Sequence, residues 1–173
     1  MGVADGRDAN FVCRTVRGGL LVAAMNYNAP DLTLHPPRSA RVKLGGFVVL
    51  PRMIDKCRAT LVGTNGEYHY DCPLDRRFLR FAGITAEAFK AEVAAGKGDG
   101  ELLAWIESGS TTKPSEWEIE QWSAFQSARI VTDVETRDFY NGLHKAVGEK
   151  REDIGTWFEL LDLDDYVSYG GKA

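Results

Sequence analysis

The stretch that decides the fold class is SEWEIEQWSAF, residues 115–125. Ser115 stands three residues before Glu118, and this pair forms a capping box, a common start of an α-helix. Large apolar side chains follow at the spacing of one helical face: Trp117, Ile119, Trp122 and Phe125. The stretch therefore predicts a helix that turns its aromatic side chains into a core.

The segments upstream of this stretch repeat the pattern. Pro73, Thr85 and Asp99 each stand at the start of an apolar stripe, and a glycine ends each stripe. These signals predict three helices in succession between residues 73 and 109. Short helices that follow one another so closely are typical of an all-α domain.

Two further helices are predicted downstream. Thr132 and Glu135 form a second capping box. The last stripe contains Ile154, Trp157, Phe158 and Leu161, with Glu152 and Asp153 favourably placed in its first turn. All four tryptophans lie on such stripes and are expected in the core: Trp105, Trp117, Trp122 and Trp157. The chain thus predicts a mainly α, single-domain fold of about six or seven helices.

The segment before Pro73 allows two interpretations. Its apolar residues fall on one helical face and predict a helix that begins near Pro51 and ends near Val62: Phe47, Leu50, Ile54, Cys57 and Leu61. Asn65-Gly66 is a tight-turn signal, so a short β-hairpin near residues 60–70 stays open as the alternative.

The N-terminal part divides into an extension and a proline-rich segment. Residues 1–25 have no sustained period and predict a disordered extension, with translation starting at Met1 or Met25. The domain is expected over residues 26–173. Its first part, up to Gly46, contains three prolines and predicts an extended strap across the domain, with Leu32, Leu34, Val42 and Leu44 alternating; a loose linker is the alternative.

Composition excludes some classes of protein. With 44% hydrophobic and 27% charged residues, the 173-residue chain has the composition of a globular protein. Its net charge of −4 argues against non-specific binding to nucleic acid or to anionic membranes. Three cysteines without a close pair favour a reducing, cytoplasmic location.

Several short motifs occur along the chain: Leu44-Gly45-Gly46, Leu50-Pro51-Arg52-Met53-Ile54-Asp55-Lys56, Gly66-Glu67-Tyr68-His69-Tyr70, Cys72-Pro73-Leu74-Asp75 and Tyr166-Val167-Ser168-Tyr169-Gly170. Together these motifs resemble DUF5069, a bacterial family of domains of unknown function. The resemblance covers nearly everything after residue 25. It implies a small bacterial protein and supplies no substrate, cofactor or catalytic residue.

No metal or cofactor site is predicted. His69-x-x-Cys72 has the spacing of metal ligands, but no second half of such a site follows, and His35 and His144 stand apart from it. The acidic run at residues 162–165 is interpreted as a solvated surface near a helix end, because Val167 stands where a calcium loop needs glycine.

The strongest candidate site is a basic cluster. Residues 38–58 contain six basic side chains and one acidic side chain, Asp55. Arg52, Asp55 and Lys56 share one helical face. We expect the cluster to bind an anionic small molecule, since arginine suits carboxylate or phosphate. The site residues would be Arg38, Arg41, Arg52, Asp55, Lys56, Tyr68 and His69. The alternative is that Asp55 pairs with Arg52 or Lys56 on the surface without any function.

Two further hypotheses come from other classes. Cys72 stands at a predicted helix start, where the helix dipole favours a thiolate, and His69 could act as its base, as in a thiol enzyme. Alternatively, the protein is an interaction or homo-oligomerising module in which the basic strap meets an acidic surface at residues 149–165 of another chain. The sequence leaves open whether the protein is an enzyme.

Overall fold

The computed structural model describes residues 29–173, and this part of the chain forms seven α-helices and no strand. The helices are α1 (Leu50–Val62), α2 (Pro73–Ala82), α3 (Ala86–Ala94), α4 (Asp99–Gly109), α5 (Glu116–Ser127), α6 (Val134–Gly148) and α7 (Trp157–Ser168). The prediction of a mainly α fold is therefore confirmed. The predicted extension over residues 1–25 lies outside the described residues. No described helix is long and apolar enough to cross a bilayer.

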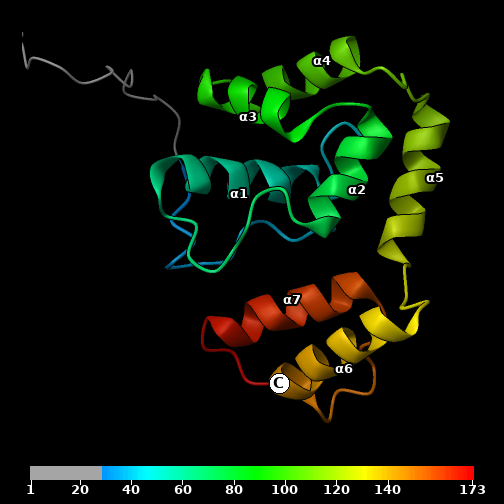
Figure 1. Ribbon diagram of the computed structural model, residues 1–173. Helices are drawn as coiled ribbons and strands as arrows, with labels where there is room; N and C mark the ends of the chain where they lie inside the picture. Colours follow the sequence, from blue (N-terminus) through cyan, green and yellow to red (C-terminus); the bar gives the residue numbers. More distant parts are fainter. Residues whose placement is uncertain (1–28) are drawn as a thin grey trace, which may run out of the picture.

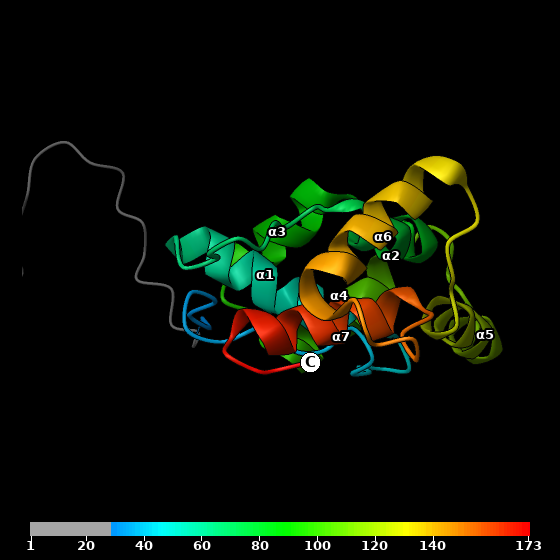
Figure 2. The ribbon, with the colours of Figure 1, turned by 90° about the horizontal axis from the view of Figure 1, so that it is seen from below.

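Helix α1 is the centre of the fold. In Figure 1, α3 and α4 lie on one side of α1, the α6–α7 hairpin lies on the other side, and α5 stands at the edge of the molecule. Nine of the thirteen residues of α1 are buried, including charged ones. Seen from below, α7 passes in front of α1 (Figure 2). Polar side chains of α1 are therefore enclosed by other elements.

An aromatic core joins α2 and α5 to the start of α1. The rings of Phe47 and Phe78 meet edge to face with centroids 5.5 Å apart. Phe81 stacks on Trp122 of α5 at 4.8 Å. Such pairs stabilise a core beyond the area that they bury. The predicted inward position is thus found for Trp122.

Other aromatic side chains on the predicted stripes face solvent. Trp117 and Phe125 of α5 are 66% and 61% exposed, and Phe139 of α6 is 66% exposed. The prediction that every tryptophan lies in the core is wrong for Trp117. On α5 the fully buried positions are polar, Ser123 and Gln126, because one narrow face of this helix meets the domain.

The proline-rich segment is an ordered strap. Leu32 is buried, and its amide donates to Thr64 O at 2.8 Å. The amide of Val49 donates to Ala40 O. Tyr169, after α7, donates its phenolic hydroxyl to the carbonyl of Leu32 at 2.5 Å. The expected alternation fails, since Leu34 is 73% exposed and Val42 is 41% exposed.

The alternative of a hairpin near residues 60–70 is wrong. Helix α1 continues to Val62, and Gly63 ends it in the left-handed conformation (φ 77°). The Asn65-Gly66 turn joins two helices, with the amide of Tyr68 bonded to Asn65 O. A Cβ on Gly66 would lie 2.8 Å from Leu32 O, so the strap passes where a side chain would otherwise stand.

Two of the predicted helix starts are shifted. Asp133, not Thr132, caps α6 by accepting a bond from the amide of Thr136. Helix α7 begins after Thr156, which forms a capping box with Glu159, so Ile154 and the acidic pair before it precede the helix. Because of this shift, the acidic run at residues 162–165 lies inside α7.

Candidate functional site

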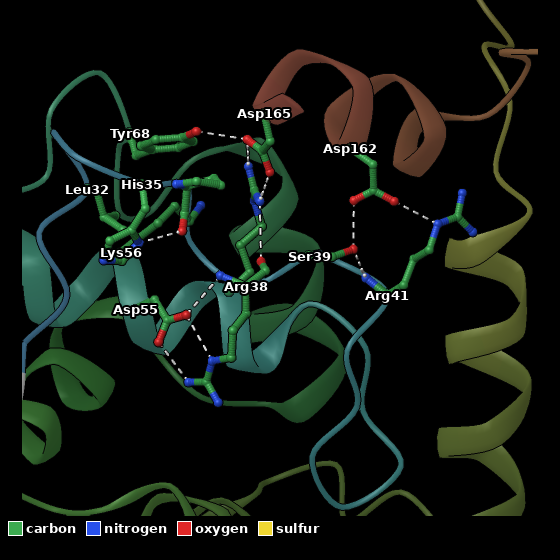
Figure 3. A network of polar contacts seen from close by, with 12 residues as sticks. Leu32, His35, Arg38, Ser39, Arg41, Asp55, Lys56, Tyr68, Asp162 and Asp165 are labelled. Atoms are coloured by element: carbon green, nitrogen blue, oxygen red, sulfur yellow. Dashed lines mark hydrogen bonds and ion pairs between the residues drawn. The ribbon is translucent and has the colours of Figure 1, made fainter. Parts of the chain in front are cut away.

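Arg52 and Asp165 form a buried bidentate ion pair between α1 and α7. Their N–O distances are 2.6 and 2.9 Å, and the two side chains are 5% and 8% exposed. Tyr68 donates its hydroxyl to the same carboxylate at 2.8 Å (Figure 3). Burial, followed by the charge of Asp165, raises the pKa of Tyr68. The pair fastens α7 to the central helix.

Arg38 of the strap binds two carboxylates. Its Nε and Nη2 donate to Asp55 of α1, each at 2.8 Å, and its backbone amide also donates to Asp55 (Figure 3). Its Nη1 donates to Asp99 at the start of α4, which also pairs with Arg58 at 2.8 Å. Burial lowers the pKa of Arg38, but its bonds to the two carboxylates outweigh burial and raise it. The strap is thereby held against α1 and α4.

Lys56 forms the third buried pair, with Asp75 of α2. Its Nζ lies 2.7 and 2.9 Å from the two carboxylate oxygens of Asp75, which is fully buried. Burial raises the pKa of the Asp75 carboxyl in spite of the nearby ammonium group. The same Nζ lies 3.2 Å from Sγ of Cys72, the N-cap residue of α2. A partly buried thiol thus stands next to an ammonium group.

Arg41 makes the outermost pair. Its Nε donates to Asp162 of α7 at 2.9 Å, and Ser39 donates to the same carboxylate at 2.6 Å (Figure 3). The Arg41 and Asp162 side chains are 41% and 35% exposed. Exposed pairs of this kind add little stability. They extend the same connection between the strap and α7 towards the surface.

The structure gathers most of the predicted site residues around α1 but gives them separate partners. Asp55 does not pair with Arg52 or Lys56 on the surface, as the alternative interpretation had it, but with Arg38. His69 is exposed. An anion that enters the cluster would have to displace carboxylates that already hold these cations. Anion binding at this place stays a prediction.

The carboxylates that complete the pairs were missed in the sequence: Asp75, Asp99, Asp162 and Asp165. The interpretation of residues 162–165 as a solvated surface is wrong for Asp165, which is buried. A signal was present, because the Thr156–Glu159 capping box would have placed Asp162 and Asp165 one turn apart on the same helix.

Residues 29–173 contain no group of three or more His, Cys, Asp or Glu side chains placed to hold a metal. A cleft of about 270 Å³ lies between α4 and α5, with Phe47 and Ile106 at its apolar side and Lys113 among its polar lining. It lies apart from the basic cluster.

Comparison with known proteins identifies a family whose function is unknown. No curated protein matches the chain. The family model described as Domain of unknown function (DUF5069) matches residues 34–167, from the strap into the last turn of α7. The matched range contains every ion pair between the strap, α1, α2 and α7 described above. The chain therefore belongs to the DUF5069 family of domains of unknown function.

Proposed function

We propose that this protein is an interaction module that associates with a second copy of itself through α5. One observation carries the proposal: Trp117 and Phe125, two large aromatic side chains on α5, are 66% and 61% exposed. Apolar surface of this kind on a folded domain is typical of a contact with another protein.

The exposed side chains form one stripe along α5. Gln121 lies between Trp117 and Phe125 at helical spacing, and Ala124 and Ala128 extend the exposed face. The opposite face is already occupied, since Trp122 stacks on Phe81. The stripe therefore has no partner among residues 29–173, and a second helix fits it.

A second copy fits because the stripe is complementary to itself. With a two-fold axis at Gln121, two antiparallel α5 helices place Trp117 of each copy against Phe125 of the other. The N-terminal half of α5 carries three glutamates, whereas residues 121–128 carry no charge. The antiparallel arrangement therefore keeps the glutamates of the two copies apart, whereas a parallel one would oppose them.

Charge is not the driving force in this association. The basic strap does meet the acidic segment of α7, but both belong to one chain, through Arg41–Asp162 and the neighbouring pairs. An apolar stripe predicts a dimer that persists when salt is raised from about 0.1 to about 1 M, where the Debye length falls from about 10 to about 3 Å.

The test is the molar mass in solution, measured by analytical ultracentrifugation at both salt concentrations. We expect Trp117→Glu and Phe125→Glu to give monomers. Leu34→Glu is the matched control, because Leu34 is equally apolar and 73% exposed but lies on the strap. A monomeric wild-type protein, or a dimer that all three variants retain, would contradict the proposal.

Thiol chemistry at Cys72 is a second candidate function, favoured by the 3.2 Å distance between its Sγ and Nζ of Lys56. An ammonium group at a helix start stabilises a thiolate. Lys56 would stabilise the thiolate by its charge, which differs from the role of base that we predicted for His69. We also propose a cytoplasmic location, where Cys57 and Cys72, both free, would stay reduced.

Alkylation tests the thiol proposal in a Cys13→Ser background. Iodoacetamide should modify Cys72 rapidly near neutral pH and leave Cys57 unmodified, because burial raises the pKa of Cys57 to about 12. Mass spectrometry of the digested protein separates the two sites. Cys72 reacting no faster than a small-molecule thiol would remove this candidate.

A further inference from the structure

Arg129, two residues after the end of α5, is a cation without a counter-charge in the described part of the chain. Its carbonyl accepts a bond from the amide of Trp157 at 3.0 Å, which ties the end of α5 to the start of α7. Its guanidinium group lies over the ring of Trp157, 5.3 Å from the centroid. The side chain is half-buried, and no carboxylate among residues 29–173 pairs with it.

The surroundings of Arg129 disfavour its positive charge. Its Nε is buried without a hydrogen-bond partner in the described part of the chain. Burial, followed by repulsion from Arg77 of α2, lowers the pKa of Arg129 to about 10. Arg38 and Arg52, each bound to aspartate, have raised pKa values instead.

Arg77 of α2 is a second arginine without a carboxylate partner in the described part of the chain. It is exposed on α2 next to Phe78, whose ring packs against Trp122 of α5 with centroids 6.1 Å apart. Two arginines that pair with no carboxylate among residues 29–173 thus lie where α2 packs on α5 and where α7 begins beside the end of α5.

We propose that Arg77 and Arg129 form a binding site for an oxyanion, a phosphate or carboxylate group. The anion supplies the counter-charge that both side chains lack, and the planar guanidinium of Arg129 suits two parallel hydrogen bonds to its oxygens. Trp157 fixes the plane of that group from one side. The site involves no residue of the exposed stripe on α5, so it does not rest on self-association.

The experiment is a calorimetric titration of the full chain with inorganic phosphate and, separately, with malonate. Wild-type protein should bind at least one of them. Arg129→Gln should weaken binding at least tenfold, and Arg77→Gln should also weaken it. Arg129→Lys, which keeps the charge but loses the planar fork, should fall between Arg129→Gln and wild type. Stronger binding of phosphate or of malonate identifies which class of oxyanion the site prefers.

Arg80→Gln is the matched control, since Arg80 is exposed on the same helix and its loss changes the net charge equally. It should bind as wild type does. Circular dichroism and the melting temperature of each variant show that the fold persists. Absent binding of both anions to wild-type protein would overturn the proposal. So would equal weakening by Arg80→Gln and Arg77→Gln, which indicates a general charge effect.

Discussion

Around α1 each buried cation pairs with an aspartate, whereas near the end of α5 no carboxylate among residues 29–173 pairs with Arg129 or Arg77. The pairs of Arg52 and Lys56 have N–O distances of 2.6–2.9 Å and enclose their charges almost completely. Arg129 is also half-buried, but the group that covers its guanidinium is the ring of Trp157, and no carboxylate among residues 29–173 pairs with it.

The same contrast holds for apolar groups. Helix α1 is enclosed on nearly every side, whereas α5 exposes two large aromatic side chains. A high density of charge in the sequence thus marks internal connections in this protein. Among residues 29–173, Arg129, Arg77 and the exposed aromatic side chains of α5 lack such partners, and they lie elsewhere. A binding site is better sought among those groups than in the densest cluster.

Among the variants that test this comparison, removal of Arg52 should lower the free energy of unfolding most. Arg52→Ala leaves the Asp165 carboxylate buried without its cation, which costs about 3–5 kcal/mol in the free energy of unfolding. Urea unfolding measures it. The double variant Arg52→Met with Asp165→Leu should recover most of the loss, since apolar groups replace both charges. A loss under about 1 kcal/mol for Arg52→Ala would show that the pair is dispensable.

Replacement of Asp99 should lower the free energy of unfolding by a smaller amount, and this loss should depend on pH. Burial raises the pKa of Asp99, but Arg38 and Arg58 outweigh burial and lower it below 3.8. A lowered folded-state pKa means that the stabilisation is present above about pH 4 and is lost as pH falls through the folded-state value. We expect Asp99→Asn to cost about 1 kcal/mol at neutral pH and to flatten the acid decline in unfolding free energy. An unchanged acid decline would contradict this account.

A variant of Arg41 tests whether solvent exposure makes the outer ion pair weaker than the buried ion pairs. Because Arg41 and Asp162 are both more than a third exposed, Arg41→Ala should change the unfolding free energy by less than about 1 kcal/mol. The same urea titration as for Arg52→Ala gives the comparison directly. A loss as large as that of Arg52→Ala would mean that burial does not decide the strength of these pairs.

The smallest effect is expected at Arg129. Arg129→Gln removes a desolvated charge and loses its contact with Trp157, two changes of opposite sign, so the unfolding free energy should stay within about 0.5 kcal/mol. Thermal and urea unfolding in anion-free buffer provide the check. A loss comparable to that of Arg52→Ala would indicate that Arg129 has a structural partner and would weaken the contrast.

The parts of the fold that follow from local signals were predictable. The capping box at Ser115 and the proline at the start of α2 lie where the helices begin. Trp117 was misassigned because the period of a helix shows which residues share a face, not which faces another element covers. For α7, the apolar stripe includes Ile154, but the capping box of Thr156 and Glu159 starts the helix later, at Trp157.

In each ion pair of the candidate site, only the basic residue was predictable from the sequence. The basic residues stand close together in the sequence, so their cluster is visible, and Arg52 and Lys56 do share a buried face. Their partners are distant: Asp165 lies 113 positions after Arg52, and Asp99 lies 61 positions after Arg38. No local pattern specifies which aspartate reaches which cation, because that depends on how the helices pack.

The long separation of Arg52 and Asp165 also has a consequence for synthesis on the ribosome. Arg52 of the central helix is made early, but Asp165 of α7, which neutralises it, is made 113 residues later. At about 5–20 residues per second, Arg52 waits roughly 6–23 s for its carboxylate. During that interval the nascent chain has a central helix whose charged face cannot yet be enclosed, so the completed interior should appear only after α7 has left the exit tunnel.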